Sequence, residues 1–174
     1  HSSLSLGYAV MFSELILAPV TPSNTARGAG IIFPIIKNLP SLYGSEPNSS
    51  SAKKIGSYIM WTGITADCGT SSIFLTDMAP NLLLIGIVKG ASGVDISWAT
   101  WFLGLLPLSI ILVCCVPWLI YIIYPPEIKK SPEISRWAAQ ELETMGVLAW
   151  REKAMLILML SALLLWIFAG DYIN

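Results

Sequence analysis

The residues best suited to chemistry lie in one polar stretch between two strongly apolar segments. The stretch reads Pro22-Ser23-Asn24-Thr25-Ala26-Arg27-Gly28-Ala29-Gly30. Hydroxyl and amide groups and the free N–H groups at the start of a helix are donors that suit an anion, and glycine lets the backbone approach a ligand closely. The stretch therefore predicts a binding site for a small anion. The alternative is plain N-capping of the following helix by Ser23 or Asn24.

Arg27 is the residue on which this interpretation depends most. It lies about one helical turn inside the second apolar segment, where a cation costs at least ~2.5 kcal/mol to insert. We expect its charge to serve an anionic substrate. The alternative is a structural salt bridge to Glu14, Asp67 or Asp77. Asp67 and Asp77 lie within apolar sequence and are functional candidates on that ground.

The composition indicates a protein embedded in a membrane. Apolar residues make up 55% of the chain and charged residues 12%, whereas a soluble domain carries about a quarter charged residues. The formal net charge is −1, so the chain lacks the basic field that nucleic acid requires. The single histidine is His1, which excludes a histidine-based metal or acid–base centre. Because the chain opens in apolar sequence without an initiator Met, we expect it to be a fragment.

Two short apolar arms flank the polar stretch and predict a re-entrant helical hairpin over residues 1–39. The arm from Gly7 to Val20 gives about 21 Å of helix, which is short of the ~30 Å hydrocarbon core, and Pro22 ends it. Irregular polar chain at membrane depth survives only where it is buried or lines a cavity. The alternative is one kinked spanning helix from Gly7 to Ile36.

The rest of the chain predicts a broken helix and further spanning helices. After a polar loop over 40–54, residues 55–88 are apolar but interrupted by two polar clusters, which favours two half-helices around an unwound centre. Residues 96–126 predict a spanning helix, 127–153 an amphipathic interfacial linker, and 154–174 the start of another spanning helix. The expected fold class is an all-α polytopic membrane protein.

These motifs together resemble the divalent anion:sodium symporter family over nearly the whole chain. The run from Thr21 to Gly28 resembles the family's Ser-Asn-Thr motif. Gly69-Thr70-Ser71 followed by Ala79-Pro80-Asn81-Leu82 looks like its next motif, and the segment from Pro132 to Lys153 looks like its linker. Within the family the chain is most similar to bacterial citrate and tartrate exchangers and plastid 2-oxoglutarate/malate translocators.

The resemblance implies two inverted repeats, each with a hairpin tipped by its own Ser-Asn-Thr, with substrate between the tips. It also implies elevator-like movement and a homodimer in the lipid bilayer. Because the chain contains one Ser-Asn-Thr, we expect it to be mainly the second part of the first repeat, without the second repeat that completes the site. The implied substrate-binding residues are Ser23, Asn24, Thr25, Arg27, Gly28, Pro80 and Asn81. The candidates for a cation site or ion pairs are Asp67, Gly69, Thr70, Ser71 and Asp77.

The function that the resemblance implies is secondary transport of dicarboxylates. We expect 2-oxoglutarate/malate exchange across the plastid inner envelope. The alternatives are a sodium-coupled di- or tricarboxylate symporter, a citrate/tartrate exchanger and, more remotely, an anion channel or a structural subunit. Sodium-coupled relatives use sodium ions near this tip. Arg27 would replace that charge, so no cofactor is expected and sodium is not favoured.

An enzyme is not expected. An intramembrane aspartyl protease would need two carboxylates close enough to share a proton. Asp67 and Asp77 lie ten residues apart in one segment, and neither has a Gly-x-Gly-Asp context.

Overall fold

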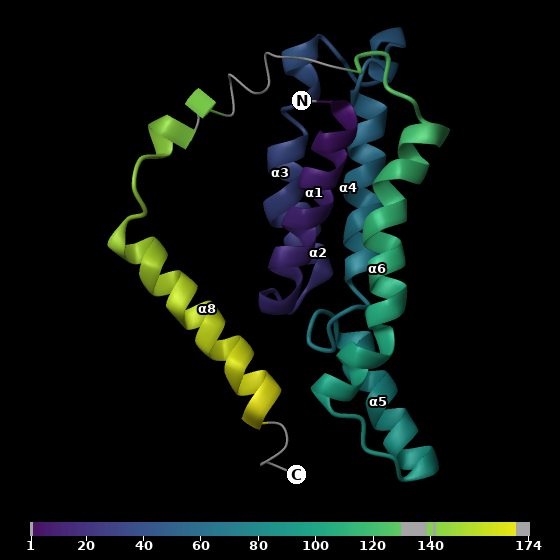
Figure 1. Cartoon of the computed structure of the whole chain (residues 1–174), viewed down its shortest axis with the longest axis vertical. Coiled ribbons are helices and arrows are strands. Elements are labelled where there is room, and N and C mark those ends of the chain that lie inside the picture. The colour runs from purple at the N-terminus through teal and green to yellow at the C-terminus, as the bar shows by residue number, and fades with distance from the viewer. Residues whose placement is uncertain (1, 130–138, 141, 170–174) are drawn as a thin grey trace.

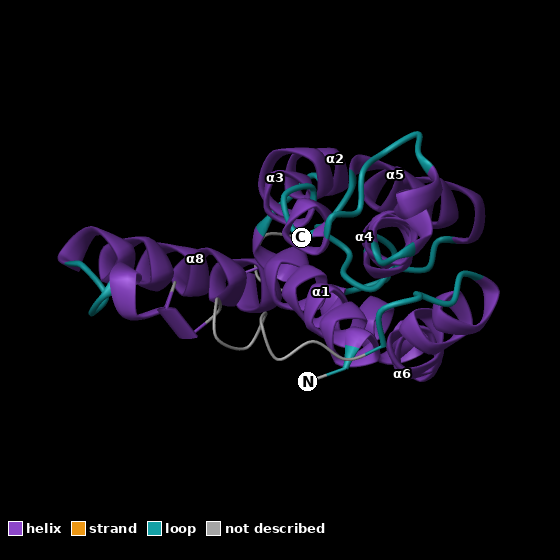
Figure 2. Cartoon of the chain, turned by 90° about the horizontal axis from the view of Figure 1, so that it is seen from above, coloured by secondary structure: helices purple, strands orange, loops and turns teal. Residues whose placement is uncertain are grey.

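The structure, a computed structural model, describes residues 2–129, 139–140 and 142–169. Over these residues the regular elements are all helical and none is a β-strand, which confirms the all-α class for the part of the chain described. Figure 1 shows a bundle of α1 to α6, and Figure 2, a view from above, shows α8 extending away from that bundle. Residues 130–138 and 141, which carry much of the predicted linker, lie outside the described residues.

The first apolar arm and the polar stretch form a helical hairpin. Helix α1 (Ser3–Leu17) is followed by a 3-10 turn at Ala18–Val20 that contains a proline. The chain then reverses, and a second arm begins with α2 (Asn24–Arg27). Figure 1 shows the two arms side by side, with the N-terminus and the end of the second arm at the same end of the bundle. The two arms are therefore not one continuous helix.

The second arm changes its helical pitch along its length. Its middle part, Gly28–Ile32, is a π-helical turn, and it ends in α3 (Phe33–Ile36). π-helical turns inside α-helices occur often at functional sites. Two short 3-10 turns at Pro40–Tyr43 and Ser50–Lys53 then lead to the next helix.

The segment that predicts a broken helix contains α4 (Gly56–Thr70) and α5 (Ala79–Ser92), separated by residues 71–78. The connection between them is packed: Ile73 and Phe74 are buried in a cluster with Ala18 of the hairpin turn. Figure 1 shows that the hairpin tip is level with the end of α4, while α5 continues beyond it.

Helix α6 (Trp98–Ile123) runs back along the bundle and includes Pro107 and Pro117. It packs against α1 and α4, which also pack against each other. The contact of α1 with α4 is close, since a Cβ atom added at Gly7 would lie 1.9 Å from the hydroxyl of Tyr58. The buried apolar core formed by these elements comprises Val10, Met11, Ile32, Ile36, Leu39, Ile55, Tyr58, Ile59, Ala66, Val116 and Ile120.

Helix α8 (Trp150–Ala169) begins four residues before the predicted boundary at 154. Its start is fixed by Glu152, whose Oε2 accepts a hydrogen bond from the backbone N–H of Ala149 at 2.7 Å. Gly146 precedes it with a positive φ of 66°, a backbone conformation that commonly ends a helix. The described part of α8 meets the rest of the chain at the Ala18–Val20 turn and at α6.

Two stretches within the described residues are long and apolar enough to cross a membrane: Ser3–Val20 and Trp98–Ile123. Many large apolar side chains of α5, α6 and α8 also point outward. Contiguous apolar surface of this extent marks contact with a membrane or another protein surface.

Candidate functional site

The polar tip of the hairpin is shaped by an N-cap. Ser23 has extended backbone angles, and its Oγ accepts a hydrogen bond from the N–H of Ala26 at 3.2 Å. The capping alternative is therefore realised by Ser23. Its hydroxyl hydrogen remains a donor, since capping uses only the acceptor capacity of the oxygen. Beside it, Asn24 is half-buried and Thr25 is exposed.

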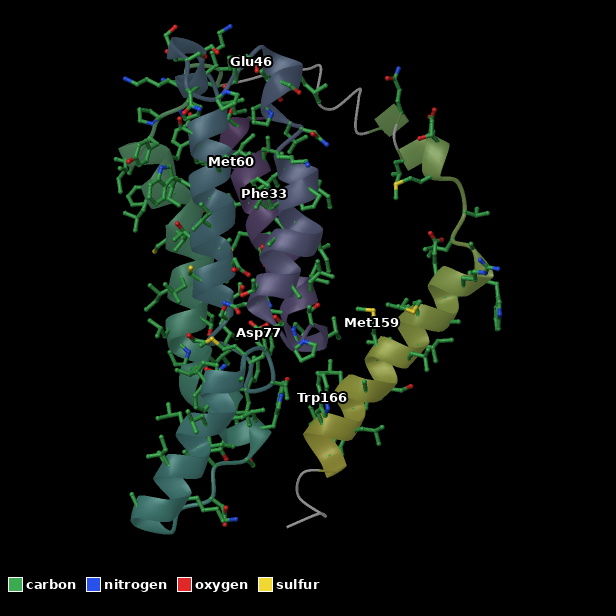
Figure 3. All side chains as sticks on the ribbon, turned by 180° about the vertical axis from the view of Figure 1, so that it is seen from behind. Phe33, Glu46, Met60, Asp77, Met159 and Trp166 are labelled. Atoms are coloured by element: carbon green, nitrogen blue, oxygen red, sulfur yellow. The ribbon has the colours of Figure 1, made fainter. Side chains whose placement is uncertain are left out.

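Behind the tip, Arg27 is the centre of a buried group of charges, which we call the Arg27 cluster: Arg27, Glu14, Asp67 and Asp77. Arg27 Nε donates to Glu14 Oε2 at 2.6 Å, and Nη2 donates to Asp67 Oδ1 at 3.1 Å. Nη1 is ion-paired with Asp77, and Nη2 also contacts Thr70 Oγ1 at 3.1 Å. Figure 3 shows Asp77 beside the hairpin tip. The cluster thus joins the tip to α1, to the end of α4 and to the connection before α5.

The salt-bridge alternative for Arg27 is realised with all three carboxylates at once. The side chains of Arg27, Glu14 and Asp77 have 0% exposure, and that of Asp67 has 18%. Removing such charges from water costs several kcal/mol per ion unless each is paired. In this arrangement the guanidinium is occupied by the protein's own carboxylates and is not presented to an anion from solution.

Gly28 matters because of Asp67. A Cβ atom added at Gly28 would lie 2.8 Å from Cγ of Asp67, whereas one added at Gly30 would meet nothing within 4 Å. Gly28 therefore admits the Asp67 carboxylate to the Arg27 cluster. We expected it to admit a ligand, and that role stays a prediction.

The residues around the broken helix have different surroundings. Asn81 is buried, and its Nδ2 donates to the backbone carbonyls of Ser71 and Phe74, both at 3.0 Å. Ser71 Oγ donates to the backbone carbonyl of Asp67 at 2.5 Å. These two side chains hold the connection between α4 and α5 in place. Within the described residues there is no group of three or more His, Cys, Asp or Glu side chains arranged to hold a metal ion.

Thr70, Pro80 and Gly69 are three further predicted residues near the tip and the broken helix. Thr70 Oγ1 accepts a hydrogen bond from Arg27 Nη2 and donates one to the backbone carbonyl of Ala66 at 2.9 Å. Pro80 is exposed in the first turn of α5. Gly69 has open space beside its Cα. The substrate and cation roles of all three stay predictions.

A cavity of ≈ 290 Å³ lies between the hairpin and α4 and connects the tip to the Arg27 cluster. Polar groups enter it from Thr25, Glu14 and Asp67, and most of the remaining wall is apolar. Its lining is Glu14, Thr25, Gly28, Ala29, Ile32, Phe33, Ile36, Met60, Gly63, Ile64, Asp67 and Cys68. Phe33 and Met60, labelled in Figure 3, come from its two walls.

Glu14 was predicted only as an alternative salt-bridge partner of Arg27 and not as a site residue. Its signal is in the sequence, because it is the only charged residue between Gly7 and Val20. The sequence did not show that α1 carries Glu14 to the same guanidinium as Asp67 and Asp77, because that depends on how α1 packs against α4.

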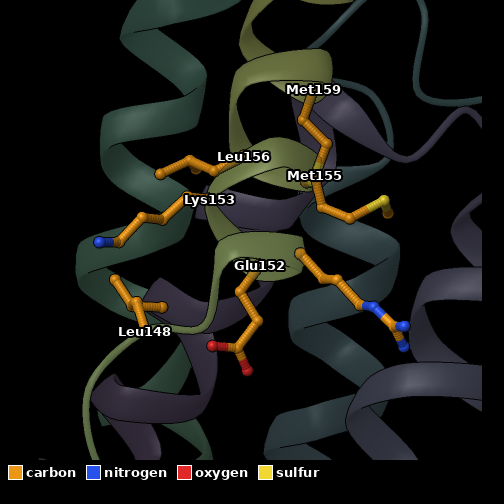
Figure 4. A pocket seen from close by; sticks show the side chains of 7 residues that line it. Leu148, Glu152, Lys153, Met155, Leu156 and Met159 are labelled. Atoms are coloured by element: carbon orange, nitrogen blue, oxygen red, sulfur yellow. The ribbon is translucent and has the colours of Figure 1, made fainter.

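A second hollow, of ≈ 400 Å³, runs along the first turns of α8 (Figure 4). Its walls come from one stretch of chain: Leu148, Arg151, Glu152, Lys153, Met155, Leu156 and Met159. It contains no residue of the hairpin tip or the Arg27 cluster, so the candidate site is the tip with the cavity behind it.

The chain is similar in sequence to known bacterial proteins. The chain is 68% identical over 174 residues to proteins named L-tartrate/succinate antiporter from Escherichia coli strain K12, Escherichia coli strain UTI89 and Shigella flexneri. The match covers 100% of this chain and 36% of each relative, so the chain spans about a third of the relatives' length. These relatives are bacterial, and their names favour the tartrate alternative over plastid 2-oxoglutarate/malate exchange, which they do not support.

The family comparison covers the whole chain. The model for the sodium:sulfate symporter transmembrane region matches residues 1–174. It confirms the resemblance to divalent anion:sodium symporters, and both this family and the relatives above are named as transporters rather than enzymes. The chain therefore belongs to the sodium:sulfate symporter transmembrane family and is part of an integral membrane protein.

Proposed function

We propose that this chain forms one side of the substrate site in a secondary carrier that exchanges dicarboxylates, with L-tartrate and succinate as its substrates. The observation that carries the proposal is the 68% identity, over all 174 residues, to relatives named for that exchange. Since the chain spans 36% of their length, the other side of the site would come from a second hairpin of the complete carrier.

We propose that the hairpin tip binds one carboxylate group of the substrate. Ser23, Asn24 and Thr25 bring two hydroxyls and an amide to the turn, and the second arm begins there. The first N–H groups of a helix have no partner within the helix, and Ser23 caps that of Ala26. A helix start of this kind favours an anion. A dicarboxylate that leaves water needs such fixed donors, because an unpaired charge in an apolar medium is very costly.

The tip would act from within the bilayer. Helix α1 has 15 residues, or about 22 Å of length. Helix α6 has 26 residues, or about 39 Å. The first arm, 18 residues to Val20, is thus at the lower limit of length for a crossing, but the chain reverses after it, and the polar turn packs against the broken helix. Irregular backbone at membrane depth is tolerated where it is buried in protein in this way.

Arg27 would make the exchange independent of sodium. The Arg27 side chain is a permanent part of the tip, whereas a sodium ion must enter with each substrate. Because three carboxylates surround it and leave the cluster net negative, Arg27 would replace sodium as the cation that holds the tip together and not as a source of net positive charge for the substrate. Its pairing with Glu14, Asp67 and Asp77 would keep the tip fixed to the broken helix without a metal ion. A direct contact between Arg27 and the dicarboxylate stays a prediction.

The test is counterflow in proteoliposomes. The carrier used is a chimera in which this chain replaces the matching 174 residues of the Escherichia coli K12 L-tartrate/succinate antiporter. We expect uptake of labelled succinate to require internal L-tartrate or succinate, and to be unchanged when choline replaces sodium. Uptake that needs no internal dicarboxylate would favour a channel, and uptake that needs sodium would favour a symporter.

The role of the tip is tested with a matched pair of asparagines. Asn24 lies at the tip, and Asn38 lies at the other end of the hairpin, where its Nδ2 donates to the carbonyl of Pro34 at 3.2 Å. A hydrogen bond to a charged group contributes about 1.5–3 kcal/mol. Asn24→Ala should therefore lower exchange by about tenfold or more, while Asn38→Ala leaves it near wild type. Equal effects of the two substitutions would contradict a binding role for the tip.

A further inference from the structure

The Arg27 cluster contains more negative than positive groups. One guanidinium faces three carboxylates, so the cluster has a formal charge of −2 when every group is ionised. Two oxygens in it, Glu14 Oε1 and Asp77 Oδ2, are buried and have no hydrogen-bond partner. An ionised oxygen in that position costs several kcal/mol, and buried acids avoid the cost by taking up a proton.

A proton can compensate the excess negative charge of the cluster more readily than a metal ion can. Hard cations need several oxygen ligands at once. The described part of the chain contains no group of three or more acidic, histidine or cysteine side chains arranged for that purpose. A proton needs only one oxygen.

The helices decide which carboxylate is the better proton acceptor. Glu14 lies in the last turn of α1, and its own backbone carbonyl accepts the N–H of Ala18, which caps the helix end. The negative end of the helix dipole disfavours a carboxylate there. Asp77 lies two residues before α5, where the positive end of a helix dipole favours one. Asp77 is thus the better permanent counter-ion for Arg27, and Glu14 is the better proton acceptor.

Glu14 lies in the wall of the cavity behind the tip, with a side chain that has 0% exposure. Asp67 and Cys68 line the same ≈ 290 Å³ space. This volume exceeds by far the roughly 10–15 Å³ that one water molecule needs. The charged groups facing Glu14 are Arg27 from the second arm, Asp67 from α4 and Asp77 from the connection before α5.

We propose that Glu14 is a proton-binding site and that its carboxyl group is protonated in this arrangement. The proton binds Oε1, and Oε2 keeps the hydrogen bond from Arg27 Nε. No other bond is made or broken. The formal charge of the cluster then falls to −1, and the remaining excess belongs to Asp67, whose side chain is partly exposed.

The test is infrared spectroscopy, at neutral pH, of the chimera described above reconstituted in lipid. We expect the C=O stretching band of a protonated carboxyl group, which shifts in heavy water. Glu14→Gln should remove intensity from this band, whereas the exposed control Glu46→Gln should leave it unchanged. Absence of the band from the wild-type chimera, or a band that Glu14→Gln leaves unchanged, overturns the proposal. The readout uses no substrate, so its failure is distinct from a failure of the exchange assay.

A second measurement uses stability. Glutamine is a neutral isostere of the protonated acid, so Glu14→Gln should fold and match the wild-type unfolding midpoint at about pH 4 and below, where glutamate is largely protonated in the unfolded chain as well. As the pH rises above that value, the wild-type midpoint should fall relative to that of the variant, because the folded chain must then take up a proton that the unfolded chain has lost. The midpoint of the glutamine variant should fall less. A glutamine variant that does not fold, or one with the same pH profile as wild type, would contradict a protonated Glu14.

Discussion

Arg27 and Lys89 are both cations that form ion pairs, but their environments are opposite. Arg27 is fully buried among three carboxylates, whereas Lys89 Nζ lies 2.7 Å from Asp95 Oδ1 with side chains that are 52% and 65% exposed. The 2.7 Å of the exposed pair lies between the 2.6 Å contact of Arg27 with Glu14 and its 3.1 Å contact with Asp67. Distance therefore does not decide which ion pair matters more for stability. The cost of removing the charges from water decides it, because that cost makes each buried partner depend on the others.

The largest effect is expected from Arg27→Gln. This substitution leaves three carboxylates around a neutral side chain, and breaking a buried pair by removing one partner costs about 3–5 kcal/mol. Thermal and denaturant unfolding in detergent should show a loss of that size, and the chimera should lose exchange. A loss below about 1 kcal/mol, the range of exposed pairs, would remove the contrast between the two cations. Wild-type exchange in this variant would also contradict the proposed role of Arg27.

A smaller loss is expected from Asp77→Asn. It leaves Arg27 paired with Glu14 and Asp67 and brings the formal charge of the cluster closer to neutral. The cost is then that of one impaired hydrogen bond, about 1–3 kcal/mol, in the same unfolding assay. If Asp77→Asn destabilises the chain as much as Arg27→Gln does, then the cluster does not contain the excess of carboxylates over cations that its geometry indicates.

Gly28→Ala and Gly30→Ala form a matched pair within one π-helical turn. The new methyl group at position 28 would meet the Asp67 carboxylate at 2.8 Å, while that at position 30 would meet nothing. Overpacking costs about 1–3 kcal/mol, whereas alanine in place of a helical glycine gains about 0.5–1 kcal/mol. Unfolding midpoints should therefore move in opposite directions. Midpoints that move together would show that Gly28 does not admit Asp67.

The smallest effect is expected from Lys89→Gln. An exposed pair contributes about 0–1 kcal/mol, and salt screens it. The unfolding free energy should change within that range and become indistinguishable from wild type in high salt. A salt-independent loss of several kcal/mol would mean that exposure does not separate the two cations.

The chain reverses and the helix breaks where the sequence predicts, while the re-entrant path of the hairpin in a membrane stays a prediction. Pro22 and the small polar residues after it mark the turn, and the polar clusters in 55–88 mark the interruption between α4 and α5. These are local signals, since proline and capping residues act within one helical turn. The π-helical pitch of Gly28–Ile32 has no such local signal and was not predicted.

The partners of Arg27 could be proposed from the sequence but not selected. Glu14, Asp67 and Asp77 each appeared as an alternative, and the structure pairs all three with one guanidinium. A guanidinium has five N–H donors, so the alternatives were never exclusive. Their convergence depends on the packing of the hairpin against α4, which no local pattern encodes. The contact of Gly28 with Asp67 was missed for the same reason.

The most direct test of the buried Arg27 cluster is a double-mutant cycle of Arg27→Gln with Asp77→Asn, read as unfolding free energy. The reference is a cycle of Lys89→Gln with Asp95→Asn in the same chain. We predict a coupling energy of about 1–3 kcal/mol for the buried pair and less than about 1 kcal/mol for the exposed pair. Losses at Arg27 and Asp77 that simply add, within about 0.5 kcal/mol, would contradict the claim that this cluster fixes the tip to the broken helix.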